Sequence, residues 1–131
     1  MGWDSSFASR ADSGDLNIGI IGLGYVGLPT AIGFRDAGFN VWGVDLSEHI
    51  VNSLKQGVNP LGDPDLDNII PAPNSDRWQI TTSTAEATKN CDVLIVTVPT
   101  PVSHDLKPDL SYVESAGRAV FEASEKGSRK V

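Results

Sequence analysis

Apolar residues along this chain gather into short runs, separated by stretches in which apolar positions recur every three or four residues. The runs cover residues 16–21, 40–45, 78–82 and 92–98. Short apolar runs bounded by glycine, proline or polar residues are typical of β-strands. The run at 92–98 is nearly continuous and rich in β-branched residues, which predicts a strand that is buried on both faces of a parallel sheet and lies beside the first strand.

The stretches between these runs have the periodicity of amphipathic helices. Helices are predicted at residues 27–38, 47–57, 63–70, 84–89 and 111–127. Ser47 suits an N-cap, and Gly38 and Gly57 suit C-terminal stops. The last helix is expected to turn one face inward, made of Val113, Ala116, Gly117, Val120 and Phe121.

Alternating strands and helices predict an α/β fold with a doubly wound, mostly parallel Rossmann-type sheet. Right-handed crossovers place the strands in the order 3-2-1-4. Residues 130–131 would begin the next strand, so we expect the sheet to be truncated before a fifth strand. Residues 1–15 lack either periodicity and are predicted to be a disordered leader to a domain at 16–131.

Composition narrows the class of partner. The 131 residues suffice for one domain, and a net charge of -7 argues against a nucleic-acid partner, which needs clustered Lys and Arg. No apolar run approaches the roughly 18 residues that a membrane span needs. The single cysteine, Cys91, allows no internal disulfide, and no secretion signal is recognisable, so we expect a cytoplasmic protein.

The turn after the first strand carries the pattern G-x-G-x-x-G at Gly22, Gly24 and Gly27. The pattern alone is weak, but here it follows a strand and opens a helix, as the dinucleotide-binding fingerprint requires. Gly22 permits the tight turn, Gly24 lets a pyrophosphate approach the backbone, and Gly27 lets the helix pack on the strand. Tyr25 and Val26 add N–H groups at the positive end of the helix dipole, where a diphosphate would bind.

Asp45 ends the second strand about 20 residues after the glycines, where the fingerprint has an acid that binds the adenosine ribose. A 2'-phosphate there would meet a carboxylate, with a repulsion of up to about 4 kcal/mol at 4 Å and an effective dielectric near 20. No arginine at residues 46–50 could neutralise that phosphate. The sequence therefore predicts NAD rather than NADP.

Other reactive side chains have simpler interpretations. Cys91 has no neighbouring base that would make a thiolate, so we interpret it as a half-buried structural cysteine. His49 and His104 lack metal-ligand spacing and are interpreted as solvated. Asp63, Asp65 and Asp67 form an acidic cluster, which we interpret as the capped start of a helix rather than as a calcium-binding loop. No metal site is predicted.

Several ordered motifs resemble the UDP-glucose and UDP-N-acetylmannosamine dehydrogenase family. They are Gly-Leu-Gly-Tyr-Val-Gly-Leu-Pro at 22–29, Val-Asp at 44–45, residues 54–60, Cys-Asp-Val at 91–93, Val-Pro-Thr-Pro at 98–101 and Pro-Asp-Leu-Ser-Tyr-Val-Glu at 108–114. The resemblance covers roughly residues 17–131. Lys55, where the family usually has Asn, and Ser83, where it usually has an acid, depart from the pattern.

The resemblance implies oxidation of the C6 alcohol of a UDP-sugar to a carboxylate, with two NAD used in succession and a cysteine thiohemiacetal on the way. By position, Thr100 would lie near the nicotinamide and the reactive centre as an auxiliary catalytic residue, and Val98 and Pro99 would line the cofactor. The motifs are closer to the branch acting on UDP-N-acetylhexosamines than to the UDP-glucose branch. A homo-oligomer is expected for the full-length protein.

The same resemblance implies that the catalytic cysteine, the Lys and Asn that activate water, and the UDP-binding domain all lie beyond Val131. We therefore expect this chain to bind NAD and to be inactive alone. Two alternatives stay open on the sequence: a stand-alone NAD-binding regulatory module, and the nucleotide domain of a 6-phosphogluconate-type hydroxyacid dehydrogenase.

Overall fold

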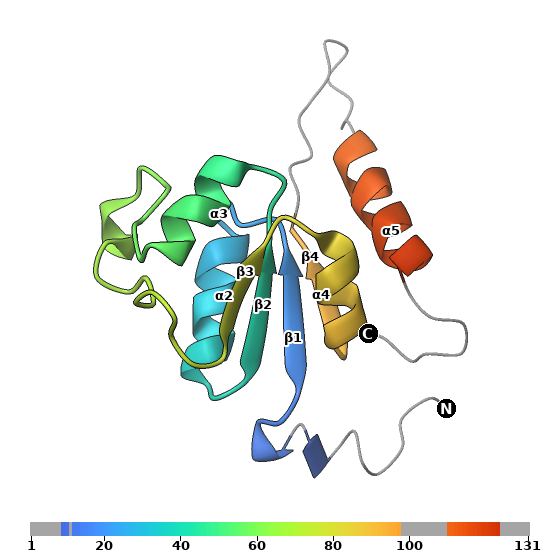
Figure 1. Ribbon diagram of the computed structural model, residues 1–131, viewed down its shortest axis with the longest axis horizontal. Coiled ribbons are helices and arrows are strands. Elements are labelled where there is room, and N and C mark those ends of the chain that lie inside the picture. The colour runs from blue at the N-terminus through green and yellow to red at the C-terminus, as the bar shows by residue number, and fades with distance from the viewer. Residues whose placement is uncertain (1–8, 11, 98–109, 124–131) are drawn as a thin grey trace.

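A parallel four-stranded sheet forms the centre of the computed structural model, which describes residues 9–10, 12–97 and 110–123 (Figure 1). Its strands are β1 (Asn17–Ile21), β2 (Asn40–Val44), β3 (Trp78–Thr81) and β4 (Val93–Val96). They lie in the order β3-β2-β1-β4, and every neighbouring pair is parallel. The predicted order, direction and α/β class are confirmed.

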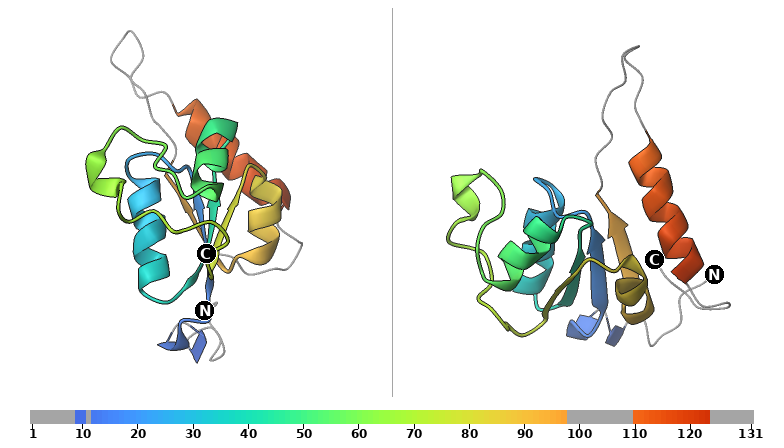
Figure 2. Two further views of the ribbon diagram at one scale, coloured as in Figure 1. Left: turned by 60° about the vertical axis from the view of Figure 1, so that its left-hand side comes forward. Right: turned by 45° about the horizontal axis from the view of Figure 1, so that its top comes forward.

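Helices cover both faces of this sheet, as a doubly wound fold requires (Figure 2). On one face lie α2 (Gly27–Asp36) and α3 (Glu48–Lys55), and on the other lie α4 (Thr84–Asn90) and α5 (Ser111–Ala123). The helix predicted after Asp63 is a single 3-10 turn, η1 (Pro64–Leu66). None of the described helices is long and apolar enough to cross a membrane.

Two hydrophobic clusters correspond to the two faces. The larger packs β-strand side chains such as Ile18 and Ile20 against Leu28 of α2 and Leu54 of α3. The smaller packs strand residues against α4 and α5 and consists of Ile21, Val44, Ala87 and Ala116. The face that carries α2 and α3 therefore holds most of the core.

Capping residues fix where the helices begin. The Ser47 side chain accepts a hydrogen bond from the Ile50 amide at 3.3 Å, as predicted. Ser83 does the same for α4, accepting from the Glu86 amide at 3.1 Å. Serine and aspartate are both good N-caps, so the departure from the family pattern at Ser83 preserves this role.

The inward face predicted for the last helix is wrong in part. Of its members, Ala116 is buried, whereas Val113 and Phe121 are exposed, the latter at 81%. The reason is that α5 packs mainly beside α4 rather than flat on the sheet, and the small residue Ala116 shares a cluster with Ala87 of α4. The predicted end near Gly127 lies outside the described residues.

The prediction that the fourth strand is buried on both faces is also wrong for its described part. Val93, Leu94 and Ile95 are half-buried and Val96 is exposed. Within the described residues β4 is an edge strand, paired only with β1, so one flank has no strand to cover it.

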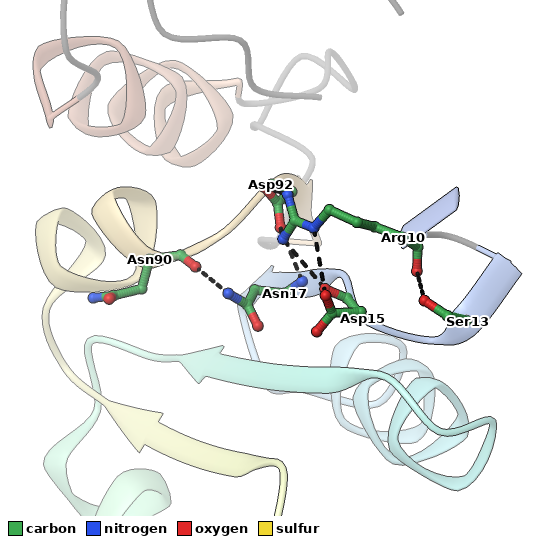
Figure 3. A network of polar contacts seen from close by, with 6 residues as sticks. All are labelled: Arg10, Ser13, Asp15, Asn17, Asn90 and Asp92. Carbon is green, nitrogen blue, oxygen red and sulfur yellow. Dashed lines mark hydrogen bonds and ion pairs between the residues drawn. The ribbon is translucent and has the colours of Figure 1, made fainter. Parts of the chain in front are cut away.

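The leader was predicted to be disordered as far as residue 15, but part of it is ordered. Residues 9–10 and 12–13 are helical, and Arg10 donates hydrogen bonds to both carboxylate oxygens of Asp92, at 3.1 and 2.8 Å (Figure 3). Asp92 also accepts from the Asn17 amide at 3.1 Å. This network, which joins the segment before β1 to the start of β4, had no signal in hydrophobic periodicity because it is made by polar side chains.

Candidate functional site

The glycine-rich turn runs from the end of β1 into α2 and is held by its neighbours on both sides. Gly22 has a φ of +101°, a value that L side chains rarely adopt. Its amide donates to the Val44 carbonyl of β2 at 2.7 Å. The positive φ gives Gly22 the role that the fingerprint predicts for it, a tight turn.

Gly27 is required by close packing. A Cβ at Gly27 would overlap the Gly22 carbonyl oxygen and the Thr97 hydroxyl. Helix α2 thus begins so near the strand ends that only a hydrogen fits between them. This close approach is the geometric reason for the third glycine of the pattern.

Gly24 faces open space, because a Cβ there would have no heavy atom within 4 Å. The amide groups of Gly24, Tyr25 and Val26 make no hydrogen bond to any other residue that the structure describes. The first four N–H groups of a helix region have no partner within the helix, and they attract anions. The turn therefore presents unpaired donors to an open space, and nothing in the described part of the chain requires Gly24 to be glycine.

A cleft of about 730 Å³ opens at the carboxyl ends of β1, β2 and β4. Its walls include predicted site residues, namely Gly22, Gly24, Tyr25, Val26 and Asp45. Residues at the starts of α3 and α4 and one face of α5 complete it, among them Ile50, Thr84, Ala116 and Ala119. Gly27 lies buried behind this wall. The carboxyl ends of parallel strands are where α/β sheets bind ligands.

Asp45 lies at this edge and already has two partners in the chain. Its Oδ2 accepts from the Leu23 amide at 2.9 Å, and its Oδ1 accepts from the Ser47 amide at 2.9 Å. A carboxylate has about four lone-pair positions, so two acceptor sites are left for a ligand. Asp45 therefore organises the glycine-rich turn in addition to the ribose role predicted from the sequence.

Thr97, directly after β4, was missed by the sequence analysis. Its hydroxyl donates to the Gly22 carbonyl at 2.7 Å and also lies 3.3 Å from the Ile21 carbonyl. Its amide donates to Ile21 at 2.8 Å and continues the ladder between β4 and β1. A signal was present, because a hydroxyl interrupts the apolar run at the end of a strand where ligand-site residues gather.

The other candidate residues are either outside the described residues or away from the cleft. Val98, Pro99, Thr100 and His104 are outside the described residues. Cys91 is 1% exposed, more buried than predicted, because it packs against Gly19 of β1 near the amino end of β4. His49 is exposed. Cys91 and His49 do not line the cleft.

Within the described ranges, no group of three or more His, Cys, Asp and Glu side chains is placed to hold a metal ion. The chemistry at the cleft is instead that of backbone donors, one carboxylate and apolar walls. Such an arrangement can bind a ligand that combines an anionic group, hydroxyl groups and a flat apolar ring.

Comparison with known proteins places the chain in a family. Residues 16–131 match the family described as "UDP-glucose/GDP-mannose dehydrogenase family, NAD binding domain". An NDP-N-acetyl-D-galactosaminuronic acid dehydrogenase of Ralstonia nicotianae is 37% identical over 110 residues, which are 84% of this chain and 25% of the relative. A UDP-N-acetyl-D-mannosamine dehydrogenase of Escherichia coli is 38% identical over 112 residues, 85% of this chain and 26% of the relative.

Among solved structures, a GDP-mannose dehydrogenase from Pseudomonas aeruginosa matches with a TM-score of 0.79 and 33% identity. The match covers 86% of this chain and 26% of that one. The chain thus spans about a quarter of the length of the curated relatives that it matches.

Proposed function

The chain belongs to the UDP-glucose/GDP-mannose dehydrogenase family as its NAD-binding domain, and we propose that the cleft at the carboxyl edge of its sheet is where it binds NAD. The observation that carries this proposal is the row of unpaired amides at Gly24, Tyr25 and Val26, facing the open cleft. Anionic phosphate is the ligand chemistry that such amides recognise.

In this arrangement the cofactor's diphosphate lies over the glycine-rich turn. The adenosine ribose is held by Asp45, whose free lone pairs accept hydrogen bonds from the two ribose hydroxyls. Leu46, which is exposed beside Asp45, offers an apolar surface to the adenine. The nicotinamide end points toward the end of β4, where Val98, Pro99 and Thr100 follow in the sequence.

For the whole protein we propose NAD-dependent oxidation of the C6 alcohol of a nucleotide sugar to a uronate, with two NAD per sugar. The sugar is proposed to be a UDP-N-acetylhexosamine, because both curated relatives described above carry names of dehydrogenases of N-acetylated sugars. UDP-glucose is the second candidate. Thr100 is proposed as an auxiliary residue near the reacting carbon.

Binding is tested by calorimetry with NAD on the wild-type chain and on a matched pair of glycine variants. Gly24→Val places a side chain in the open space over the turn and should weaken NAD binding at least tenfold. Gly33→Val makes the same change on the exposed side of α2, where a Cβ also meets nothing within 4 Å, and should bind as the wild type does. Equal affinity of all three proteins would contradict the proposed site.

Activity is tested by following NADH formation with UDP-N-acetylmannosamine, UDP-N-acetylglucosamine and UDP-glucose. We expect the whole protein to be active and the 131-residue chain to be inactive, because hydride transfer needs the sugar held against the nicotinamide. Turnover by the isolated chain that is lost in Cys91→Ser would show that the nucleophile is Cys91. NAD binding without activity in the whole protein would instead favour a regulatory module.

We also propose a cytoplasmic location and a homo-oligomer for the whole protein. The low cysteine content of this chain, with Cys91 alone, supports a reducing compartment. Cell fractionation and light scattering test the two statements, and a secreted or monomeric protein would contradict them.

A further inference from the structure

One peptide unit of the glycine-rich turn, between Gly22 and Leu23, is held by side chains at both of its ends. The Thr97 hydroxyl donates to the Gly22 carbonyl at 2.7 Å. The amide of the same peptide unit, on Leu23, donates to Asp45 Oδ2 at 2.9 Å. A side chain that follows β4 and another that follows β2 thus fix the orientation of a single peptide plane.

This peptide plane needs such restraint because it follows a glycine. The orientation of this unit is set by ψ of Gly22 and φ of Leu23, and Gly22, which has no Cβ, tolerates a wider range of backbone angles than other residues do. In the rotated orientation the Gly22 carbonyl oxygen would turn toward the Asp45 carboxylate in the cleft wall, to which the Leu23 amide donates in the structure. An oxygen there would repel the phosphate that the neighbouring amides are placed to bind.

The two restraints also support one another. A hydroxyl that donates to a carbonyl polarises the peptide unit, which strengthens the hydrogen bond that its amide donates to the carboxylate. Gly27 packs closely against both the Gly22 carbonyl and the Thr97 hydroxyl, which keeps these two groups together. Gly22 is itself buried, so its carbonyl would lack a partner if the hydroxyl were removed.

We propose that Thr97 is a positioning residue for dinucleotide binding: its hydroxyl holds the Gly22 carbonyl away from the cleft, and so keeps the turn in the orientation that binds a diphosphate. This proposal rests on the NAD site proposed above. Thr97 acts through the turn and is assigned no contact with the reacting atoms.

The test compares Thr97→Val, Thr97→Ala and Thr97→Ser in the whole protein that carries this chain. Valine keeps the branched shape but replaces the hydroxyl by a methyl group, which lies beside Gly27. Alanine removes the hydroxyl and puts no methyl group in its place. Both should bind NAD and ADP about three- to tenfold more weakly, the range expected for one net hydrogen bond. Serine keeps the hydroxyl and should restore affinity to within about twofold of the wild type.

Thr88 provides a matched control. Thr88 is buried, and its hydroxyl also donates to a backbone carbonyl, that of Thr84 at 2.8 Å, but it does so inside α4. Thr88→Val should lower thermal stability and leave NAD affinity unchanged. An equal loss of affinity in Thr88→Val and Thr97→Val would overturn the proposal, because general destabilisation would then explain both.

Two further readouts separate this inference from the proposed function. Adenosine, which lacks the diphosphate, should bind to Thr97→Val as it binds to the wild type in an NMR titration, and an equal loss for adenosine overturns the positioning role. Without any ligand, the Leu23 amide should exchange with solvent faster in Thr97→Val than in Thr97→Ser. If the wild type binds no NAD, the proposed function fails; if it binds NAD and Thr97→Val binds equally well, only the inference on Thr97 fails.

Discussion

The two ends of the same sheet use their polar groups in opposite ways. At the amino end, the Asp92 carboxylate accepts from the Arg10 guanidinium and from the Asn17 amide, and the Asn17 side chain donates to the Asn90 carbonyl at 2.9 Å (Figure 3). At the carboxyl end, Asp45 accepts a hydrogen bond from only one amide of the glycine-rich turn, that of Leu23. The amides of the residues that follow, Gly24 to Val26, stay unpaired among the described residues.

The difference shows where a ligand can be recognised. Most polar backbone groups in a folded protein are paired, and a leftover donor is costly unless water or a ligand reaches it. At the amino end the chain supplies its own acceptors, so that end is structural. At the carboxyl end the donors face a cleft, so the same kinds of group are free for a partner from outside.

The largest effect is expected for Gly27→Ala, which changes the packing of the glycine-rich turn at the carboxyl end of the sheet. The added Cβ overlaps the Gly22 carbonyl, so the turn or α2 must move. We expect a loss of about 3 kcal/mol or more in the free energy of unfolding, at the upper end of overpacking effects, and no detectable NAD binding. Urea unfolding and calorimetry measure the two. Gly33→Ala is the control and should be neutral or stabilising, since its Cβ meets open space in a helix.

Asp45→Ala should have the next largest effect, on binding more than on stability. It removes the acceptor for the Leu23 and Ser47 amides and the proposed acceptor for the ribose. We expect NAD affinity to fall about tenfold or more, by the roughly 1.5 to 3 kcal/mol of hydrogen bonds to a charged group. The affinity for NADP should fall less than the affinity for NAD, because the carboxylate no longer repels the 2'-phosphate of NADP. An unchanged ratio of NAD to NADP affinity would contradict the role of Asp45.

The features predicted correctly from the sequence are those that depend on residues close together in the chain or on general rules of chain geometry. Strand order, the helices after Ser47 and at 84–89, and the fingerprint glycines follow from periodicity, capping and chirality, which depend on residues close in sequence or on general rules. Asp45 was found because the fingerprint fixes its distance from the glycines. Its bond to the Leu23 amide was not predicted, since a loop's orientation depends on atoms from several strands.

The missed features share a physical cause. Thr97 meets Gly22 across 75 residues of sequence, and Arg10 meets Asp92 across 82. Contacts of this kind arise from packing and leave no periodic trace. The inward face of α5 was misjudged for the same reason, because the neighbour that α5 packs against, α4, decides which side is covered.

Asp92→Ala tests the amino end and should affect stability alone. The Asn17 amide and the Arg10 guanidinium both lose an acceptor that is three-quarters buried, with a side-chain exposure of 25%. We expect about 1 to 3 kcal/mol less stability against urea, the cost of leaving such donors unsatisfied. NAD affinity should not change, because the site lies at the other end of the strands. Asp36→Ala, which changes an exposed carboxylate at the end of α2, is the control and should stay within about 0.5 kcal/mol.

The smallest effect is expected for Arg10→Gln, which tests whether the segment before the family match contributes to the fold. The Arg10 side chain is 38% exposed, so solvent screens its pair with Asp92, and pairs of this kind contribute about 0.2 to 1 kcal/mol. The loss should shrink when salt is raised from about 0.01 M to 1 M, because the Debye length falls from about 30 Å to 3 Å. A double-mutant cycle with Asp92→Asn isolates the pair, and a coupling energy near zero at low salt would show that the Arg10–Asp92 pair contributes nothing to stability. A clear coupling with unchanged NAD affinity would confirm that this end of the sheet is structural.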